Sequence, residues 1–370
     1  MNPLTQAAAG RNVVLGHDWL TGMRGGERVL QLHGEAFPDA PLVALFANPS
    51  AVCETIRNRT IICSRLQRFP GVTRYYRYLL PLMGSAARAV KVPQGDLLLT
   101  TSHCVAKAFR PSPGMRHMCY CFTPMRYAWL FQNEYLGPVK SVLAAPLLAH
   151  LRRWDRETSV GVDRFVAISR HVQARIQRFY GRESDVVYPP VDTQRYTPLS
   201  TPGTGDYDLI VSALVPYKRI DLAVRAYRNL SRRLVIVGTG TETAKLRALA
   251  NERVEFLGWR SDDDVRELYR NCRLLLFPGE EDFGIVPLEA MACGRPVVAF
   301  RRGGATETVL EGVSGVFFDE QNVASLAAAV ERALDTRWDA TAIRAHAERF
   351  GIERFFEEMA VCVTRTLEGN

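Results

Sequence analysis

The sequence predicts an α/β protein built from two doubly wound domains that face each other across a cleft. Short apolar runs alternate with helical patterns along the 370 residues, which is typical of repeated βα units around parallel sheets. A polar, proline-rich stretch, YPPVDTQRYTPLSTPGTGD at 188–206, interrupts the alternation, which then begins again. The length also agrees with two domains, at roughly 150 residues each.

Four apolar runs predict buried strands in the first half, at residues 12–15, 96–100, 117–122 and 164–168. A helix is expected from about Glu27, directly after the pair Gly25-Gly26. Such glycines allow a phosphate or a substrate to approach the backbone closely, although a simple tight turn explains them equally well.

Six further runs predict strands in the second half, at residues 209–212, 234–237, 254–257, 274–277, 297–299 and 316–318. Helical patterns lie between them, for example at 264–270 and 287–292. An apolar stripe over 351–367 predicts a last helix. The expected organisation is an acceptor-binding domain at 1–192, a linker at 193–206, a donor-binding domain at 207–350, and a C-terminal helix at 351–370 that packs back across the domain junction.

Composition excludes several classes of protein. With 47% hydrophobic and 23% charged residues, the chain is neither disordered nor fibrous. Its longest apolar runs are shorter than the roughly 18 to 20 residues that a membrane span needs, and no secretory signal is evident, so we expect a cytoplasmic protein. The eight cysteines contain no CxxC pair, and we expect reduced thiols without a zinc site or disulfides.

The net charge of +8 is concentrated in one segment. Residues 51–95 contain eight basic residues and one acidic residue, Glu54. This imbalance predicts that the segment meets a negatively charged partner.

The densest group of polar residues lies in PGEEDFGIVPLEAMACGRPVV at 278–298. Pro287 suits the first position of a helix, which places Glu289 in the first turn and Glu281 in the loop before it. Backbone N–H groups at a helix start bind phosphate, and carboxylates bind sugar hydroxyls. The alternative is that Glu289 only stabilises the helix dipole and that Glu281 is solvated.

A second loop carries two cations. Lys218 and Arg219 follow the strand at 209–212, at the sheet edge where a diphosphate is expected to lie. Alternatively, either cation pairs with Asp221 on the surface. Gly238 belongs to a GxG that follows the next strand, where a plain turn explains it equally well.

His103 follows the strand at 96–100, at the strand end where ligands bind, although an isolated histidine at such a place is more often structural. The run SDDD at 261–264 suggests a metal site, but Ser261 and Asp264 are better explained as a capping box that opens a helix.

Together these motifs resemble the family 4 retaining glycosyltransferases of GT-B fold, which consists of two Rossmann-like domains. In the second half the resemblance is carried by EDFGIVPLE, AMACGRPVVA, GGATETV, VPYKR, VGTG and FLGW. In the first half it is carried by HDWLTGMRGGERVL, FPDAPLVALF, TSHCVAKAF, CYCFTPMRYAW, AISRHVQARI and YPPVD, which are similar to the branch that elongates bacterial surface polysaccharides, often with mannose.

The resemblance implies specific roles at the donor site. Lys218 contacts the diphosphate of a nucleotide-sugar with Arg219 as a helper, Glu281 holds hydroxyls of the sugar, and Glu289 binds the ribose. Lys218 and Glu281 are the expected catalytic residues. The remaining donor-binding residues are Gly25, Gly26, Gly238, Trp259 beside the base, Phe283, Gly284 and Ile285.

The acceptor side is expected to include His103, Phe122, Thr123 and Arg126. Two positions depart from the family pattern: Ala213 stands where an arginine usually precedes Val-Pro, and Phe122 stands where related sequences have the histidine of His-Thr-Pro. In the family this histidine lies beside the donor sugar, so its absence bears directly on transfer.

The implied reaction moves a hexose, with mannose expected, from a nucleoside diphosphate such as GDP to a lipid-linked saccharide, with retained configuration and no metal or other cofactor. One alternative is a silent nucleotide-sugar-binding scaffold, which Phe122 favours. Another is a glycoside hydrolase that uses Glu281 and Glu289 as its acid pair.

The basic segment interleaves arginine with aromatic residues in RFPGVTRYYRYLLPLM, which favours an interfacial helix at an anionic bilayer over a nucleic-acid groove. We expect peripheral association with the inner face of the cell membrane; a solvated basic helix is the alternative. The expected membrane-docking residues are Arg65, Arg68, Arg74 and Arg77.

Overall fold

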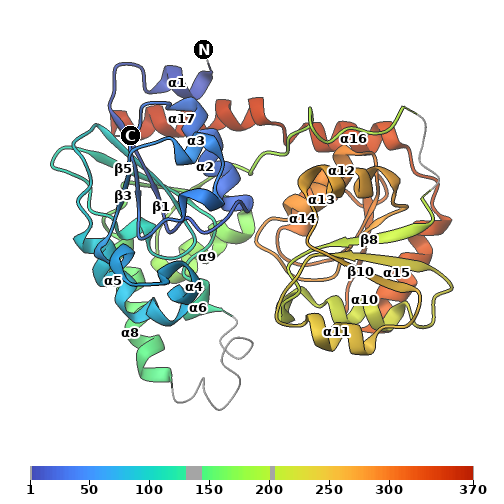
Figure 1. Ribbon diagram of the computed structural model, residues 1–370. Helices are drawn as coiled ribbons and strands as arrows, with labels where there is room; N and C mark the ends of the chain where they lie inside the picture. The colour runs from blue at the N-terminus through green and yellow to red at the C-terminus, as the bar shows by residue number, and fades with distance from the viewer. Residues whose placement is uncertain (1, 131–143, 201–204, 370) are drawn as a thin grey trace. The chain divides into compact units, whose positions relative to one another are not determined.

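The computed structural model describes residues 2–130, 144–200 and 205–369, and divides the chain into two compact units. The N-terminal unit comprises Met1–Tyr188 and Phe355–Asn370, and the C-terminal unit comprises Pro189–Arg354. The division therefore falls between Tyr188 and Pro189, a few residues before the expected linker, of which residues 201–204 lie outside the described part. Each unit has a parallel sheet with helices on both faces (Figure 1).

The sheet of the N-terminal unit has seven parallel strands in the order β3-β2-β1-β4-β5-β6-β7. Its central strands β1, β4 and β5 are buried along their length apart from Arg116, which agrees with the largely apolar runs that predicted them. The strand bounds are β1 Val13–His17, β2 Leu42–Ala44, β3 Ile61–Cys63, β4 Leu97–Ser102, β5 Arg116–Cys121, β6 Arg164–Ala167 and β7 Asp185–Val186.

Helices and short 3-10 turns surround this sheet. The helix α9, for example, starts where the Ser169 hydroxyl accepts from the Val172 N–H and ends at Gly181 in a left-handed conformation. The bounds are α1 Pro3–Ala7, α2 Gly25–Ala36, η1 Pro49–Ala51, α3 Glu54–Arg57, η2 Arg65–Arg68, α4 Val72–Tyr75, η3 Tyr76–Leu79, α5 Leu80–Ala89, η4 Ala106–Ala108, α6 Arg126–Trp129, α8 Ala145–Ser159, α9 Arg170–Tyr180 and α17 Ile352–Glu368.

The basic segment differs from the single interfacial helix that we expected. It is divided into η2, α4, η3 and α5. Gly71 adopts a left-handed conformation with φ 69° at the start of α4, and this conformation cannot continue a helix from the preceding turn. None of the described helices is long and apolar enough to cross a membrane.

The sheet of the C-terminal unit has six parallel strands in the order β10-β9-β8-β11-β12-β13. The strand order reverses between β8 and β11, and the loops after these neighbouring strands emerge at the same edge, where ligands bind in doubly wound folds. The bounds are β8 Tyr207–Val211, β9 Arg233–Val237, β10 Val254–Gly258, β11 Leu275–Phe277, β12 Val297–Phe300 and β13 Gly315–Phe318.

The helices of this unit confirm one prediction about a helix start and correct another. Ser261 and Asp264 form the predicted capping box at the start of α12. The helix α13 begins at Ile285, however, so Pro287 is its third residue and not its first. The bounds are η5 Pro216–Lys218, α10 Ile220–Ala226, α11 Thr243–Leu249, α12 Asp262–Asn271, α13 Ile285–Ala292, α14 Ala305–Thr308, α15 Val323–Asp335 and α16 Ala340–Glu348.

Candidate functional site

The C-terminal unit brings Lys218 and Glu281 into direct contact. Lys218 ends η5 in the loop after β8, and Glu281 lies in the loop after the neighbouring strand β11. The Lys218 ammonium and a Glu281 carboxylate oxygen form an ion pair. Both side chains remain partly exposed, at 13% and 24%, so that a ligand can reach the pair.

Arg219 adopts the pairing that the sequence left open as the structural alternative. Its Nε lies 3.1 Å from an Asp221 carboxylate oxygen, and its guanidinium also donates to Gln321 Oε1 at 3.3 Å. Among the described residues other than glycine, Arg219 alone has a positive φ, of 52°. Strain of this kind often accompanies a functional loop.

Gln321 joins the loop after β8, which carries Arg219, to the loop after β11, which carries Glu281. Besides accepting from Arg219, its amide donates to the backbone oxygen of Pro278 at 3.1 Å. No local pattern in the sequence indicates this role, because Gln321 lies in the loop after β13, distant from both loops in the chain.

Glycines allow the backbones of neighbouring loops to touch. A Cβ atom added at Gly279 would lie 2.8 Å from the Lys218 Cα, and one added at Gly304 would lie 2.2 Å from the Phe283 Cα. The Gly304 N–H also donates to the Glu281 carbonyl at 2.8 Å. Backbone contact therefore fixes the loop that carries Glu281.

Gly238 has a similar supporting position. Its φ is 128°, and a Cβ atom there would lie 1.9 Å from the Ser212 carbonyl oxygen, in the segment that leads to Lys218. Trp259, which follows β10, is 75% exposed and presents its ring to the solvent. Gly238 thus packs against the backbone at Ser212 and has a structural role, whereas the Trp259 ring is accessible to a ligand.

The start of α13 offers backbone N–H groups next to Glu281. Gly284 caps the helix in a left-handed conformation with φ 99°, followed by Ile285 as the first helical residue, and Phe283 precedes them as a buried side chain. The first N–H groups of a helix have no partner within the helix and are suited to an anion or a hydroxyl.

Glu289 is the fifth residue of α13, two positions further along the helix than we predicted. Because the helix begins at Ile285, its first turn contains no acidic residue, and the dipole interaction weighed for Glu289 does not occur there. Instead, the buried Tyr269 donates its hydroxyl to Glu289 Oε2 at 2.9 Å. Burial raises the pKa of Tyr269 well above its usual value, so the phenol stays protonated and orients the carboxylate.

Asp18 organises the corresponding edge of the N-terminal unit. It follows β1, is fully buried, and accepts hydrogen bonds from four successive backbone N–H groups in the loop after β4. Burial alone raises its pKa, but the charge and hydrogen bond of His103 outweigh burial and hold the pKa well below its usual range. The four donors are His103, Cys104, Val105 and Ala106, at 2.6, 3.1, 2.6 and 2.6 Å.

His103 is fixed on Asp18. Its Nδ1 lies 2.8 Å from Asp18 Oδ2, and its ring packs edge-on against Trp19 with the centroids 4.7 Å apart. The side chain remains 33% exposed. The carboxylate engages Nδ1, so Nε2 is the nitrogen that remains for a ligand. Asp18, which the sequence motif contained but we did not single out, is what orients this histidine.

A second buried carboxylate anchors the same loop. Lys107 and Asp155 form an ion pair with both side chains almost fully buried, and the Lys107 ammonium also donates to the Cys104 carbonyl at 3.1 Å. Trp129 and Tyr180 donate to the second oxygen of Asp155 at 2.7 and 2.8 Å. With its charge compensated and its oxygens hydrogen-bonded, Asp155 ties α8 to the loop.

The glycine pair lies inside α2 and not before it, since the helix begins at Gly25. A Cβ atom added at Gly26 would lie 3.2 Å from the Phe122 ring, whereas one added at Gly25 would meet nothing within 4 Å. Phe122 also packs edge-on against His17, with the centroids 6.5 Å apart. Gly26 thus accommodates Phe122, and the backbone at Gly25 is open.

The other expected acceptor-side residues differ in accessibility. Thr123 is 4% exposed, and its hydroxyl accepts from Arg175 at 3.4 Å, which gives it a local structural contact. Arg126 opens α6 and is half-buried. His103 and Arg126 are therefore the more accessible polar groups of this set.

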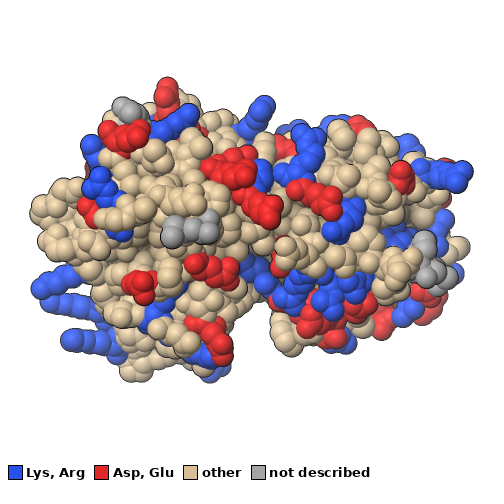
Figure 2. All heavy atoms as spheres, turned by 90° about the horizontal axis from the view of Figure 1, so that it is seen from above, with Lys and Arg blue, Asp and Glu red and all other residues tan. Residues whose placement is uncertain are grey.

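The four expected membrane-docking arginines are all exposed, and large apolar side chains are exposed beside them. Tyr78 is 84% exposed, and the guanidinium of Arg74 lies 5.6 Å from the centre of the half-exposed Tyr75 ring. The four arginines are Arg65, Arg68, Arg74 and Arg77. Seen from above, basic side chains also project from the left edge of the N-terminal unit (Figure 2).

Comparison with known proteins gives a family match for most of the C-terminal unit. Residues 198–351 match the family described as glycosyl transferases group 1. The matching segment contains Lys218, Glu281 and Glu289, the side chains gathered around the β8 and β11 loops.

Two curated relatives illustrate the similarity. A D-inositol 3-phosphate glycosyltransferase of Acidothermus cellulolyticus is 35% identical over 269 residues, which are 63% of this chain and 58% of the relative. A GDP-mannose-dependent alpha-(1-6)-phosphatidylinositol monomannoside mannosyltransferase of Mycolicibacterium smegmatis is 33% identical over 193 residues, which are 44% and 50% of the two chains. The chain thus matches only half to three fifths of the length of these relatives.

Solved structures match nearly the whole chain. Anabaena HepE in complex with UDP aligns with a TM-score of 0.71 over 96% of this chain and 98% of its own, at 17% identity. The lipopolysaccharide outer core galactosyltransferase WaaB aligns with a TM-score of 0.65 over 95% and 99%, also at 17% identity. At this level of identity the likeness defines the fold.

These findings confirm the predicted class: the chain has the GT-B fold, with one Rossmann-like sheet of seven strands and one of six. Within it, residues 198–351 match the family described as glycosyl transferases group 1.

Proposed function

We propose that the protein is a retaining glycosyltransferase that moves a hexose from a nucleoside diphosphate to a saccharide acceptor. The observation that carries the proposal is the contact between Lys218 and Glu281 at the edge of the group 1 domain. A cation for the diphosphate and a carboxylate for the sugar hydroxyls are the two groups that a nucleotide-sugar requires side by side.

The donor lies along the loops of the C-terminal unit in this proposal. Lys218 binds the diphosphate, and the N–H groups at the start of α13 contact the sugar or phosphate next to Glu281. Glu289, oriented by Tyr269, binds the ribose hydroxyls. The exposed ring of Trp259 stacks on the base.

The chemical step depends on charge stabilisation at the leaving group. As the bond between the sugar and the diphosphate breaks, negative charge grows on the phosphate, and Lys218 stabilises it. The leaving phosphate accepts the proton of the attacking hydroxyl on the same side of the sugar, which retains the configuration. Because Lys218 supplies the positive charge, we propose that the reaction needs no divalent metal; strong inhibition by EDTA would contradict this.

Mannose is the hexose that we propose, from GDP-mannose, with a lipid-linked saccharide as acceptor. The family resemblance supports mannose, as does the name of the mycobacterial relative, whereas the HepE structure contains UDP. A hydrolysis screen of the purified protein against GDP-mannose, UDP-glucose, UDP-galactose and other nucleotide-sugars decides between them. Absence of both binding and hydrolysis for the whole panel would reject the proposed function.

Phe122 supports a second candidate, a nucleotide-sugar-binding protein without transfer activity. The aromatic ring packs on Gly26 and His17, where related sequences have a histidine. Under our proposal the wild-type protein turns over donor. If the wild type binds donor without turnover and Phe122→His restores turnover, the binding protein is the correct assignment.

A glycoside hydrolase has less support. Lys218 has no role in a two-carboxylate mechanism, yet it contacts Glu281, one of the two acids that such an enzyme would need. A nucleoside diphosphate raises the Tm of a transferase by binding the folded state, whereas it leaves the Tm of a hydrolase unchanged.

We also propose that the exposed arginines and aromatic residues of 65–78 bring the N-terminal unit to the inner face of the cell membrane, close to a lipid-linked acceptor. Exposed cations attract an anionic surface, and aromatic rings insert at its interface. Equal binding to neutral and anionic vesicles, or unchanged binding after Arg74→Glu and Arg77→Glu, would refute this docking.

A further inference from the structure

The N-terminal unit contains an open hollow of about 450 Å³ outside the donor and acceptor residues described above. It lies between α5 and α8 and is closed on one side by the chain that follows η4. The lining consists of two arginines, a histidine and a serine on one hand, and aromatic and aliphatic groups on the other. The polar lining residues are Ser85, Arg88, Arg110 and His150.

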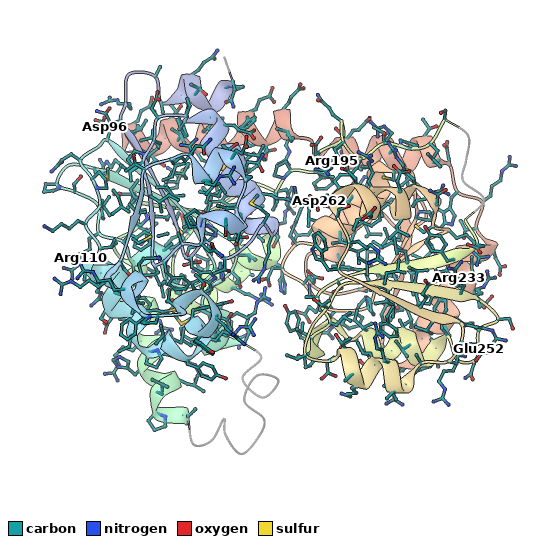
Figure 3. The ribbon with its side chains drawn as sticks, viewed as in Figure 1. Asp96, Arg110, Arg195, Arg233, Glu252 and Asp262 are labelled. Atoms are coloured by element: carbon teal, nitrogen blue, oxygen red, sulfur yellow. The ribbon has the colours of Figure 1, made fainter. Side chains whose placement is uncertain are left out.

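Among the residues that the structure describes, the two arginines of the hollow have no carboxylate partner. Neither Arg88 nor Arg110 forms an ion pair within the described ranges 2–130, 144–200 and 205–369. Figure 3 shows Arg110 at the outer edge of the N-terminal unit, beside α5. A smaller hollow of about 230 Å³ shares both arginines and includes Glu157, which pairs with neither of them. The positive charge is therefore available to a ligand.

Trp154 provides a fixed wall. Its ring packs so closely on α5 that a Cβ atom added at Gly84 would lie 2.7 Å from it. The Arg88 guanidinium lies 6.0 Å from the centre of this ring, and the buried Lys107 ammonium lies 5.4 Å from it. A guanidinium that packs beside an aromatic ring keeps its charge and its N–H groups for an anion.

Apolar side chains are exposed on both helices that form the hollow. Leu82 of α5 is 48% exposed, and Leu147 of α8 is 42% exposed. A free inorganic ion or a nucleotide would make no contact that requires exposed leucines on the helices that line its site. An anionic group attached to a hydrocarbon chain, however, satisfies both the cations and the exposed leucines.

We propose that this hollow binds the phosphate head group of an anionic membrane lipid, with Arg88 and Arg110 on the phosphate oxygens and Leu82 and Leu147 against the lipid. The site is separate from the four arginines of 65–77, which attract the membrane without regard to the head group. It does not depend on glycosyl transfer, so failure of the one proposal leaves the other standing.

The experiment measures head-group selectivity by vesicle flotation of the full chain. Phosphatidylcholine vesicles contain either phosphatidic acid, whose phosphate is terminal, or phosphatidylglycerol, with the compositions adjusted to equal zeta potential. We expect tighter binding to phosphatidic acid, because two arginines and His150 can surround a terminal phosphate. We expect the wild type to bind vesicles with phosphatidic acid about tenfold more tightly than vesicles with phosphatidylglycerol, which corresponds to roughly one additional charged contact.

Arg88→Gln with Arg110→Gln removes this preference and leaves binding to phosphatidylglycerol vesicles mostly intact, because Arg65, Arg68, Arg74 and Arg77 remain. The matched control is Arg228→Gln with Arg337→Gln, two exposed arginines of the C-terminal unit, which preserves the preference. No vesicle binding, equal binding to both lipids by the wild type, or a preference that survives in the Arg88 and Arg110 variant overturns the proposal. Tighter binding to RNA than to vesicles also overturns it.

Discussion

The carboxyl edges of the two sheets are built in opposite ways. In the C-terminal unit, Lys218 and Glu281 are partly exposed, and glycines that touch the neighbouring backbone hold their loops. In the N-terminal unit, Asp18 and Asp155 are fully buried and hold the loop after β4 through hydrogen bonds and an ion pair. The charges of the first edge are therefore accessible from the solvent, whereas those of the second edge hold its own loop in place.

This difference has a consequence for mutagenesis. If the proposed function is correct, removing a partly exposed charge from the C-terminal edge should impair sugar transfer and leave the fold intact. Removing a buried carboxylate from the N-terminal edge leaves several N–H donors without an acceptor and weakens the fold.

Lys218→Ala is expected to reduce turnover of the nucleotide-sugar about a hundredfold or more, because one preorganised contact to a developing charge contributes about 3 to 4 kcal/mol. The Tm should change little. Steady-state kinetics and a thermal melt measure both quantities. Lys245→Ala is the control, since this lysine is exposed and pairs only with Glu242 on the surface. A near-normal rate for Lys218→Ala would exclude the proposed role.

Asp18→Asn is expected to lower the free energy of unfolding of the N-terminal unit by about 3 kcal/mol, because an amide cannot accept all the hydrogen bonds that the carboxylate accepts. Hydrogen exchange of the segment around 102–108 reports the loss locally. The exposed Asp39→Asn serves as a control. Unchanged protection of this segment would show that the backbone, and not Asp18, holds the loop.

Acid is expected to destabilise the N-terminal unit before the C-terminal unit. Burial lowers the pKa of His33 to about 3 and that of His117 to about 4, and it also lowers the pKa of His17. In the unfolded chain these groups take up protons near pH 6.5, so stability falls below that pH, by about 1.4 kcal/mol per pH unit for each histidine. Asp18, with its lowered pKa, adds a further loss below about pH 4.

The C-terminal unit contains one histidine, His346. It also contains a buried carboxyl group, Asp208, which stabilises the fold more at low pH than at high pH. Burial raises the pKa of Asp208, so its contribution to stability is present at low pH and declines as the pH rises through the folded value. Hydrogen exchange at pH 7 and pH 5, corrected for intrinsic rates, compares the units. His33→Leu should reduce the dependence of the stability of the N-terminal unit on pH, whereas substitution of the exposed His150 by glutamine should not. Simultaneous loss of protection in both units at pH 5 would contradict the prediction.

Glu281→Gln should produce the smallest change, an increase of about threefold in affinity for a nucleoside diphosphate. The substitution releases Lys218 from a partly exposed ion pair, whose contribution is at most about 1 kcal/mol. Turnover should fall at the same time, because a neutral amide binds sugar hydroxyls less strongly. Calorimetry with GDP and UDP measures the affinity. Weaker nucleotide binding would mean that Glu281 supports the loop more than it competes for Lys218.

The sequence determined the architecture of the protein. Apolar runs such as 117–122 and 274–277 are typical of strands that are buried on both faces, and such runs predicted strands of both sheets. The sequence also predicted the capping box of Ser261 and Asp264, because that interaction spans three residues. Local rules succeed where the interacting groups are close in the chain.

The start of α13 shows where a local rule fails. The preference of proline for the first helical position predicted a start at Pro287, but left-handed Gly284 lets the helix begin at Ile285. Pro287 is tolerated as the third residue because the N–H groups of the first turn have no partner within the helix, so the missing donor costs nothing there.

Only the tertiary structure decided which polar groups meet. Lys218 contacts Glu281 because β8 and β11 are neighbours in the sheet, although the two residues are distant in the chain. Asp18 likewise reaches the loop after β4 from the end of β1, because β1 and β4 are neighbours in the N-terminal sheet. Such contacts arise from strand order and backbone approach, which no local pattern records.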